Sequence, residues 1–259
     1  MRSFEDRFSG GIGHYITWLK ERVQEMYRIL KPTGSIFLHC DWHANAYVRV
    51  DILDKIFGYN RLLNEIIWKR ATSGSSKSIA KRLGTDHDVI FWYSKSDKFT
   101  FKPVWLPYPE KEIEKRFTKS DSNGYYKDAE LATYSKEKLE QLKKENRLII
   151  SPTGKYRYKI YLKDIKGVLA DDIWTHIPPV NSQAKERIGY PTQKPEALLQ
   201  RIIEMASDEN DIILDPFVGG GTTVMVAEKL HRRWIGIDQS VQAIKVTEMR
   251  LQRDIDLFR

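Results

Sequence analysis

The sequence has almost no cysteine and no long apolar segment. Cys40 is the single cysteine in 259 residues, which excludes an internal disulfide and fits a reducing compartment. No run approaches the roughly 20 apolar residues of a membrane-spanning helix, and the N-terminus lacks a signal-peptide pattern. We find no internal repeats. These absences predict a cytoplasmic protein that does not enter the membrane.

The composition is that of a basic globular protein. Hydrophobic residues make up 41% of the chain and charged residues 30%, enough for a core in about one or two domains. A net charge of +8 and an aromatic content of 12% suit nucleic acid, because cations displace phosphate counterions and rings stack on bases. A generally basic protein would have the same net charge and aromatic content. The position of the charged residues must therefore decide whether the protein binds nucleic acid.

Helical and strand patterns alternate at both ends of the chain. Apolar residues at helical spacing run from Tyr15 to Leu30 and again from about residue 44 to 57. Apolar strands are predicted at Ser35–Cys40, Leu62–Trp68 and Val89–Tyr93. This alternation predicts an α/β domain with a largely parallel sheet.

The alternation stops between residues 97 and 172. Prolines and the turn Ser122–Gly124 break this stretch, a charged helix is predicted at 136–146, and the α/β pattern resumes after Ile173. We therefore divide the chain into a core, 1–96 and 173–259, and an insert, 97–172.

Two segments carry clustered positive charge. At strand spacing, Lys155, Arg157, Lys159 and Lys163 share one face, as a phosphate-contacting ridge or as the lysines of an exposed edge strand. Residues 71–82 are small, polar and basic, as in a loop that orders on a phosphate backbone or in a plain surface loop.

A glycine-rich loop joins a strand to a helix near the C-terminus. The strand 211–214 leads into residues 215–223, Asp-Pro-Phe-Val-Gly-Gly-Gly-Thr-Thr, and a helix follows. Glycines let backbone approach a ligand closely, and a helix N-terminus presents free N–H groups. The next strand ends at Asp238, whose carboxylate can accept the hydroxyls of a ribose. The pattern predicts a site for a nucleoside-containing cofactor.

The acidic strand end distinguishes two classes of cofactor. Asp215 would repel the pyrophosphate of a dinucleotide, and Val224 stands where a dinucleotide-binding loop uses a third glycine. S-adenosylmethionine has no phosphate and carries a sulfonium and an ammonium group, so an acidic strand end suits it. The alternative, a tight strand–helix turn without a ligand, is disfavoured by two acidic strand ends in register. We predict S-adenosylmethionine as the cofactor.

The loop at 215–223 resembles the cofactor motif of the DNA amino-methyltransferases that modify adenine N6 or cytosine N4. Residues 190–195, Tyr-Pro-Thr-Gln-Lys-Pro, resemble the second cofactor element of this family, near the methionine part of the cofactor. Residues 30–35, 64–69, 171–174 and 181–187 are also similar to the family. By this resemblance the cofactor-binding residues are Asp215, Pro216, Phe217, Gly219, Gly221, Thr222, Thr223, Asp238, Thr192, Gln193 and Lys194.

The resemblance covers nearly the whole chain, most weakly in the insert, and the order of motifs is that of the beta class. It implies a Rossmann-like methyltransferase sheet, with 97–172 as the target-recognition region. It also implies double-stranded DNA as substrate and methyl transfer to an exocyclic amino group, with adenine N6 favoured.

One motif of this family is absent. Amino methylation needs an acceptor for the exocyclic N–H bonds and an aromatic platform for a flipped base, which the family supplies from an Asp/Asn/Ser-Pro-Pro-aromatic sequence. Residues 177–180, Ile-Pro-Pro-Val, have neither the acceptor nor the ring, and residues 215–217 lack the second proline. In the family the motif precedes a segment resembling residues 4–11. We therefore assign no catalytic residue and expect a truncated product, a misplaced start or half of a split enzyme.

The expected loss is also structural. The motif's strand lies centrally in the family's sheet, between the strand near Phe37 and the one that ends at Asp215. Its absence predicts two inner edges with unpaired backbone groups. A complementing chain that supplies the segment, or a homodimer, would then be a partner.

Two functions remain open for this chain. The first is a DNA amino-methyltransferase, and the alternative is a catalytically inactive methyltransferase-like DNA-binding subunit or relic, which the absent motif favours. The insert and the family-like segments disfavour a small-molecule or RNA methyltransferase.

A group of polar residues follows the strand at 35–40. The spacing of His39, Cys40, Asp41 and His43 matches no common zinc pattern, and strand alternation points His39 and Cys40 to opposite faces. We predict no metal and place residues 41–43 at the rim of the ligand crevice. Trp68 is expected either to stack on a flipped base or to pack in the core.

Overall fold

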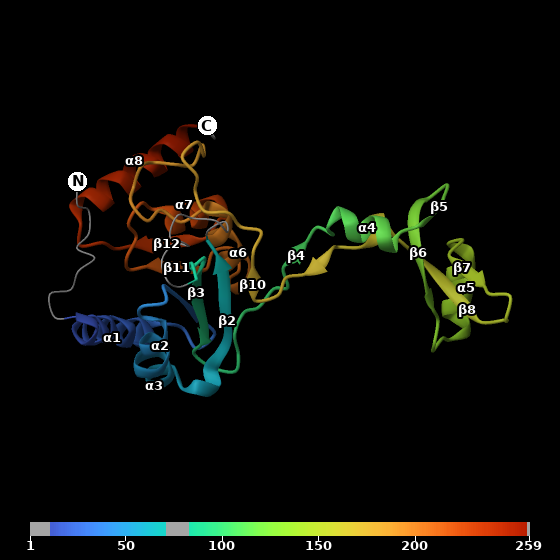
Figure 1. The fold of residues 1–259 in the computed structure, drawn as a ribbon, viewed down its shortest axis with the longest axis horizontal. Helices are drawn as coiled ribbons and strands as arrows, with labels where there is room; N and C mark the ends of the chain where they lie inside the picture. The colour runs from blue at the N-terminus through green and yellow to red at the C-terminus, as the bar shows by residue number, and fades with distance from the viewer. Residues whose placement is uncertain (1–10, 71–82, 258–259) are drawn as a thin grey trace. The chain divides into compact units, whose positions relative to one another are not determined.

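The structure, a computed structural model, describes residues 11–70 and 83–257 and divides into two units (Figure 1). Unit 1 lies within Met1–Lys102 and Asp171–Arg259, and unit 2 is Pro103–Ala170. Unit 2 is shorter at both ends than the predicted insert 97–172. The predicted loop at 71–82 lies outside the described residues. No helix in the described part of the chain is long and apolar enough to cross a membrane.

The first part of unit 1 alternates helices and strands close to the predicted positions. Its elements are α1 (Gly11–Ile29), β1 (Ser35–Cys40), α2 (Asn45–Tyr47), η1 (Val48–Leu53), α3 (Asp54–Phe57), η2 (Tyr59–Arg61), β2 (Leu62–Lys69) and β3 (His87–Ser94). α2, η1 and α3 form one helical segment over the predicted 44–57, and η1 has a π-helical register. Gly58 ends this segment with a φ of +92°, a conformation that glycine adopts without strain.

A four-stranded sheet organises this part, in the order β1-β3-β2-β10, where β10 is Ile173–Trp174 (Figure 1). β3 is antiparallel to both β1 and β2, and β10 is parallel to β2. The prediction of a largely parallel sheet is therefore wrong for these strands. All of β3 after His87 is buried, which gives an antiparallel strand the unbroken apolar run of a parallel one.

The main core lies between this sheet and the helices that precede β2. Val23 of α1 and Val48, Ile52 and Leu53 of η1 are 0% exposed. Cys40 belongs to this core and His39 does not, as strand alternation predicts. The core therefore fixes which face of β1 carries polar side chains.

The second part of unit 1 contains the glycine-rich loop. Its elements are α6 (Glu196–Ala206), β11 (Ile212–Asp215), α7 (Thr222–Lys229), β12 (Arg233–Gly236) and α8 (Val241–Leu257). β11 and β12 are parallel and form a separate two-stranded sheet. Ile213 and Trp234 pack on one face of it against Ile203, Val226 and Ala227 of α6 and α7.

The two sheets of unit 1 have open edges. Among the described residues, β1 pairs only with β3 and β11 only with β12. The face of β11–β12 that points away from α7 is also open, since Ile212, Ile235 and Ile237 are 47%, 49% and 52% exposed. Parallel strands are ordinarily covered on both faces. The absent motif predicts such a gap in the sheet, and that explanation of the open edges stays a prediction.

Unit 2 is a small β-rich unit. Its elements are β4 (Trp105–Leu106), α4 (Glu110–Arg116), β5 (Lys119–Asp121), β6 (Gly124–Glu130), α5 (Lys136–Lys144), β7 (Leu148–Ile150), β8 (Tyr156–Tyr161), η4 (Leu162–Asp164) and β9 (Val168–Leu169). Four strands form an antiparallel sheet in the order β5-β6-β8-β7, and β4 pairs with β9. β8 is an interior strand, so its interpretation as an edge strand is wrong.

Candidate cofactor and substrate site

The glycine-rich loop is held between β11, α7 and the residue after β12. The Val218 N–H donates to the Ile237 carbonyl at 2.9 Å, and the Gly221 N–H donates to the Val218 carbonyl at 2.8 Å. Gly219 and Gly221 have φ values of +50° and +74°. This left-handed backbone favours glycine at both positions.

Gly221 also lies against α8 at close range. A Cβ at this position would come within 2.7 Å of Thr247 Oγ1, closer than non-bonded atoms approach. A Cβ at Gly220 would come within 3.0 Å of Ile188, and one at Gly219 within 3.2 Å of Tyr190, which are tight but less severe approaches. The loop is therefore a tight backbone turn at the N-terminus of α7, where N–H groups remain without intrahelical partners.

The two predicted carboxylates both bind this loop. Asp215 Oδ1 accepts from the Phe217 N–H at 3.0 Å, and Asp238 Oδ2 accepts from the Gly219 N–H at 2.9 Å. Asp238 Oδ1 accepts from the Ser240 N–H at 2.8 Å. Burial raises the pKa of the Asp215 carboxyl, hydrogen bonds from Thr223 and Phe217 oppose this, and the Asp238 charge adds to the rise. The strand ends thus concentrate negative charge at the mouth of the loop.

Thr222 connects the loop to the segment at 192–194. Its hydroxyl donates to the Lys194 carbonyl at 3.2 Å and accepts from Arg250 Nη1 at 3.1 Å. Arg250 is 3% exposed, donates also to the Gly220 carbonyl at 3.0 Å, and pairs with Glu196 at 2.7 Å. The Thr222 side chain therefore links the loop to Lys194 and Arg250, a structural role that the family resemblance did not suggest.

The segment at 192–194 is folded by its own polar groups. Gln193 Nε2 donates to the Glu186 carbonyl at 2.7 Å, and Gln193 Oε1 accepts from the Ile188 N–H at 3.0 Å. Lys194 Nζ donates to the Thr192 carbonyl at 3.0 Å. Burial lowers the pKa of Lys194, against the attraction of Asp88 and Asp215. Gln193 shapes the turn, whereas the Lys194 ammonium lies within electrostatic range of the strand end at Asp215.

The structure brings the three predicted elements together. The loop contacts Asp238 through Gly219 and residues 192–194 through Thr222, and Asp215 binds Thr223 and Phe217. Pro216 is half-buried and Phe217 is 45% exposed, beside the loop. Their contacts with a cofactor stay predictions.

A buried polar group close to this site was not predicted from the sequence. Asp88 of β3 is 6% exposed, pairs with His39 Nε2 at 3.0 Å and accepts from Arg70 Nε at 2.7 Å. Burial lowers the pKa of His39 against the opposing effect of Asp88, which favours the neutral imidazole. Burial alone would raise the pKa of Asp88, but hydrogen bonds from His39 and Arg70 outweigh it. Lys194 acts electrostatically on both His39 and Asp88, so the group belongs to the surroundings of the cofactor loop.

The residues after β1 form pairs of their own. Asp41 binds the His43 N–H at 3.0 Å and His43 Nδ1 at 2.9 Å, and the Trp42 and His43 rings stack at 3.7 Å. The described residues contain no group of three or more His, Cys, Asp or Glu that could hold a metal. Trp68 is 3% exposed and donates to the Ile177 carbonyl at 2.8 Å, which gives it the core role.

The predicted basic ridge of unit 2 is neutralised within the unit. Lys155 pairs with Glu130 at 3.1 Å, Arg157 with Asp128 at 2.5 Å and Lys159 with Asp121 at 2.7 Å. Lys163 lies in η4, beyond the end of β8, so it does not continue the ridge. The strand spacing in the sequence located the cations of the ridge. It did not reveal the carboxylates of β5 and β6 that pair with them.

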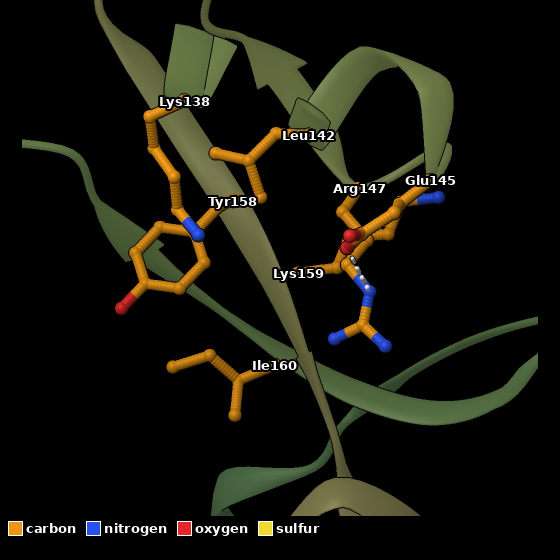
Figure 2. Close-up of a pocket in the computed structure, with 7 residues that line it drawn as sticks. All are labelled: Lys138, Leu142, Glu145, Arg147, Tyr158, Lys159 and Ile160. Atoms are coloured by element: carbon orange, nitrogen blue, oxygen red, sulfur yellow. Dashed lines mark ion pairs between the residues drawn. The ribbon is translucent and has the colours of Figure 1, made fainter. Parts of the chain in front are cut away.

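A hollow of about 300 Å³ lies between β8, α5 and the residues that follow α5 (Figure 2). Its lining residues are Lys138, Leu142, Glu145, Arg147, Tyr158, Lys159 and Ile160. Arg147 is paired with Asp164 at 2.6 Å and with Glu145 at 3.3 Å. Two of its three cations are therefore committed to carboxylates, which argues against a formed anion site.

Comparison with known proteins gives the context of this geometry. The chain is 30% identical over 264 residues to the type II methyltransferase M.EcaI of Enterobacter cloacae, a match that covers 91% of this chain and 57% of M.EcaI. The chain thus spans little more than half the length of this relative. A solved structure of PvuII DNA methyltransferase (cytosine-N4-specific) superposes with a TM-score of 0.61 at 15% identity, covering 96% of this chain and 76% of that one.

A second solved structure has the same fold. The M1.HpyAVI-SAM complex superposes with a TM-score of 0.51 at 20% identity, covering 91% of this chain and 82% of that one. At these identities the structures show the α/β Rossmann-like methyltransferase fold. A family model described as DNA methylase, of the N6/N4 methyltransferase type, matches residues 4–249. The chain belongs to the N6/N4 DNA methylase family.

Proposed function

We propose that the protein is an S-adenosylmethionine-dependent DNA amino-methyltransferase whose cofactor binds at the loop 215–223. The observation that carries this proposal is the convergence of Asp215, Asp238 and residues 192–194 on one glycine turn. M1.HpyAVI, with the same fold, is described as a SAM complex, which supports the choice of cofactor.

The residues present fit this cofactor. Asp238 keeps lone pairs for ribose hydroxyls beside its two N–H partners. Asp215 and Lys194 offer one charge of each sign for an amino-acid moiety. When bound, the cofactor supplies a methyl group activated by positively charged sulfur.

Calorimetry on the intact chain tests the cofactor site. Asp215→Asn keeps an acceptor for the Phe217 N–H but removes the charge, and we expect at least a tenfold loss of S-adenosylmethionine affinity. Glu209→Gln removes the same charge from the exposed turn before β11 and should leave affinity unchanged. A folded chain that does not bind the cofactor, or that binds it equally well after Asp215→Asn, would refute the site.

We propose double-stranded DNA as the substrate, adenine N6 as the favoured acceptor and the cytoplasm as the compartment. Unit 2 is the proposed target-recognition region, on the family resemblance alone. Digestion of treated DNA to nucleosides, followed by mass spectrometry, distinguishes N6-methyladenine from N4-methylcytosine. N4-methylcytosine as the sole product would overturn the choice of base while keeping the reaction class.

The open edges favour a second candidate, an inactive DNA-binding subunit or an enzyme completed by another polypeptide. In the described part of the chain β1 and β11 each pair with a strand on one edge only, and Ile212, Ile235 and Ile237 lie exposed on the β11–β12 sheet. We propose that a complementing chain fills this gap, with a homodimer as the competing arrangement.

Methyl transfer and light scattering on the purified chain separate these candidates. Transfer by the chain alone would exclude the inactive subunit. Cofactor binding without transfer, restored by a second polypeptide with an Asp-Pro-Pro-Tyr-type motif, would support complementation. A dimer of this chain that transfers methyl groups alone would support the homodimer.

A further inference from the structure

Two side chains on one face of α8 bind the cofactor loop. Thr247 Oγ1 donates to the Gly219 carbonyl at 3.3 Å. Arg250 Nη1 donates to the Gly220 carbonyl at 3.0 Å and to the Thr222 hydroxyl at 3.1 Å. Side chains three residues apart lie on the same face of a helix, so this face of α8 holds the loop at residues 219, 220 and 222.

The same guanidinium reaches the second cofactor element. Arg250 Nη2 donates to Glu196 Oε1 at 2.7 Å, and Glu196 begins α6 two residues after the segment at 192–194. The Glu196 N–H donates to Glu186 Oε2 at 2.8 Å, and the Glu186 carbonyl accepts from Gln193 Nε2 at 2.7 Å. Glu196 is therefore anchored to the turn that Gln193 shapes, and Arg250 connects this turn with the glycine-rich loop.

The burial and charge of Arg250 indicate more than a packing role. Arg250 is 3% exposed, so water competes little for its hydrogen bonds. Burial alone would raise the pKa of Glu196, but hydrogen bonds from Lys229 and Arg250 outweigh it, and the carboxylate stays charged. A largely buried ion pair is weak evidence for stability, because apolar side chains of similar volume often stabilise a fold as well. What the guanidinium adds is direction, since its planar fork bonds the Gly220 carbonyl and Glu196 at the same time.

We propose that Arg250 is a positioning residue of the cofactor site, which holds the glycine-rich loop and the segment at 192–194 at a fixed separation. This inference rests on the proposed function and adds a residue that the family resemblance did not suggest. In the proposed binding mode the ribose lies at Asp238 and the amino-acid part at Asp215 and Lys194, so the cofactor spans both elements. A site already held in this geometry requires less ordering when the ligand binds.

Two ligands distinguish joint positioning of the elements from a general effect on the loop. S-adenosylmethionine spans both elements, whereas 5′-methylthioadenosine keeps the nucleoside and lacks the amino-acid part. Arg250→Met keeps an unbranched apolar side chain and removes the guanidinium. By calorimetry on the intact chain, we expect S-adenosylmethionine to bind this variant roughly fivefold to fiftyfold more weakly, and 5′-methylthioadenosine less than about threefold more weakly.

A conservative variant and a matched control accompany this comparison. Arg250→Lys retains the charge, but an ammonium cannot copy the planar fork, so it should keep only part of the affinity that Arg250→Met loses. Arg232→Met is the control, because Arg232 is 9% exposed, donates to the Ser207 carbonyl at 3.0 Å and follows the C-terminal end of α7, whereas the loop precedes its start. It should lower the melting temperature and leave the affinity of the folded chain for both ligands unchanged.

The outcomes separate positioning from stability. A lower melting temperature of Arg250→Met with both affinities unchanged would overturn the inference, because Arg250 would then stabilise the fold without positioning the site. Equal losses for the two ligands would also overturn it, because an effect on the loop alone would account for them. If Arg250→Met does not fold, by circular dichroism, the same comparison of ligands on Arg250→Lys decides. Failure of the unchanged chain to bind S-adenosylmethionine would refute the proposed function itself, and this inference with it.

Discussion

A single buried carboxylate organises the polar side chains opposite the cofactor loop. Asp88 is 6% exposed and binds both His39 and Arg70. A buried carboxylate with one partner removed is costly, typically by about 3–5 kcal/mol. The Asp88 carboxylate can only accept a hydrogen bond, so the neutral His39 ring carries its proton on Nε2. Arg70 holds Asp88 in place, and the tautomer and orientation of the His39 ring are thereby fixed.

This arrangement predicts a pH dependence of stability. The pKa of His39 in the folded chain lies below its unfolded value of about 6.5. Between these two values the unfolded chain binds more protons, so the free energy of unfolding decreases as the pH falls below 6.5, by at most about 1.4 kcal/mol per pH unit for one group. His39→Gln should make this decrease shallower, measured by urea denaturation between pH 7 and 5.

The decrease should not vanish in this variant. Burial also lowers the pKa of His176, which contributes with the same sign. His87→Gln, at an exposed histidine that begins β3, serves as the control. If His39→Gln follows the same pH profile as the unchanged chain, His39 is not held neutral by its surroundings.

At the level of elements, periodicity located the helices and strands but not every direction or register. The helix over 44–57 and the strands at 35–40, 62–68 and 89–93 lie close to where the sequence predicts them. The antiparallel direction of β3 was not predictable, because its apolar run reflects burial and not strand direction. The glycine turn was predictable because only glycine tolerates its backbone, whereas Asp88 was hidden at the start of an apolar strand.

The glycine turn makes a prediction for substitution. Gly221→Ala places a Cβ at a φ of +74° and within 2.7 Å of Thr247 Oγ1. We expect a loss of about 2 kcal/mol or more in the free energy of unfolding, measured by urea denaturation. Adding Thr247→Ala to this variant removes the Oγ1 atom that the new Cβ would approach, and it should restore part of the lost free energy of unfolding.

A second glycine tests whether the lack of space for a Cβ causes the expected loss of stability at Gly221. Gly13 lies in α1, and a Cβ there would meet nothing within 4 Å. Gly13→Ala should be neutral or stabilising by about 0.5–1 kcal/mol, because alanine favours helix. Equal effects of the two substitutions would show that close approach does not select glycine at 221.

At the scale of the whole molecule, the net charge of +8 does not by itself locate a DNA surface. The ridge on β8 is offset by Asp121, Asp128 and Glu130. A cation already paired with a carboxylate releases few phosphate counterions, because breaking its own ion pair opposes the new contact. Unpaired cations near β8 are therefore better placed for this role.

We expect two of these cations, Lys163 and Lys166, to contact DNA. Both are exposed, and neither forms an ion pair with a carboxylate in the described part of the chain. Replacing both with glutamine should weaken DNA binding. It should also reduce the slope of log affinity against log salt by up to about 1.8, or about 0.9 for each phosphate that is no longer neutralised. Fluorescence anisotropy with duplex DNA at several salt concentrations measures both.

The paired ridge supplies the contrast. Lys155→Gln with Arg157→Gln removes the same charge from unit 2, but it leaves Glu130 without its partner and Asp128 with Lys119 alone. If ion pairing decides which cations contact DNA, this variant should lower affinity through these less compensated carboxylates and leave the salt slope nearly unchanged. The opposite pattern, a large change of slope from the ridge and none from Lys163 and Lys166, would mean that DNA displaces the carboxylates from β8. Unit 2 would then bind DNA by exchanging internal ion pairs for phosphate contacts.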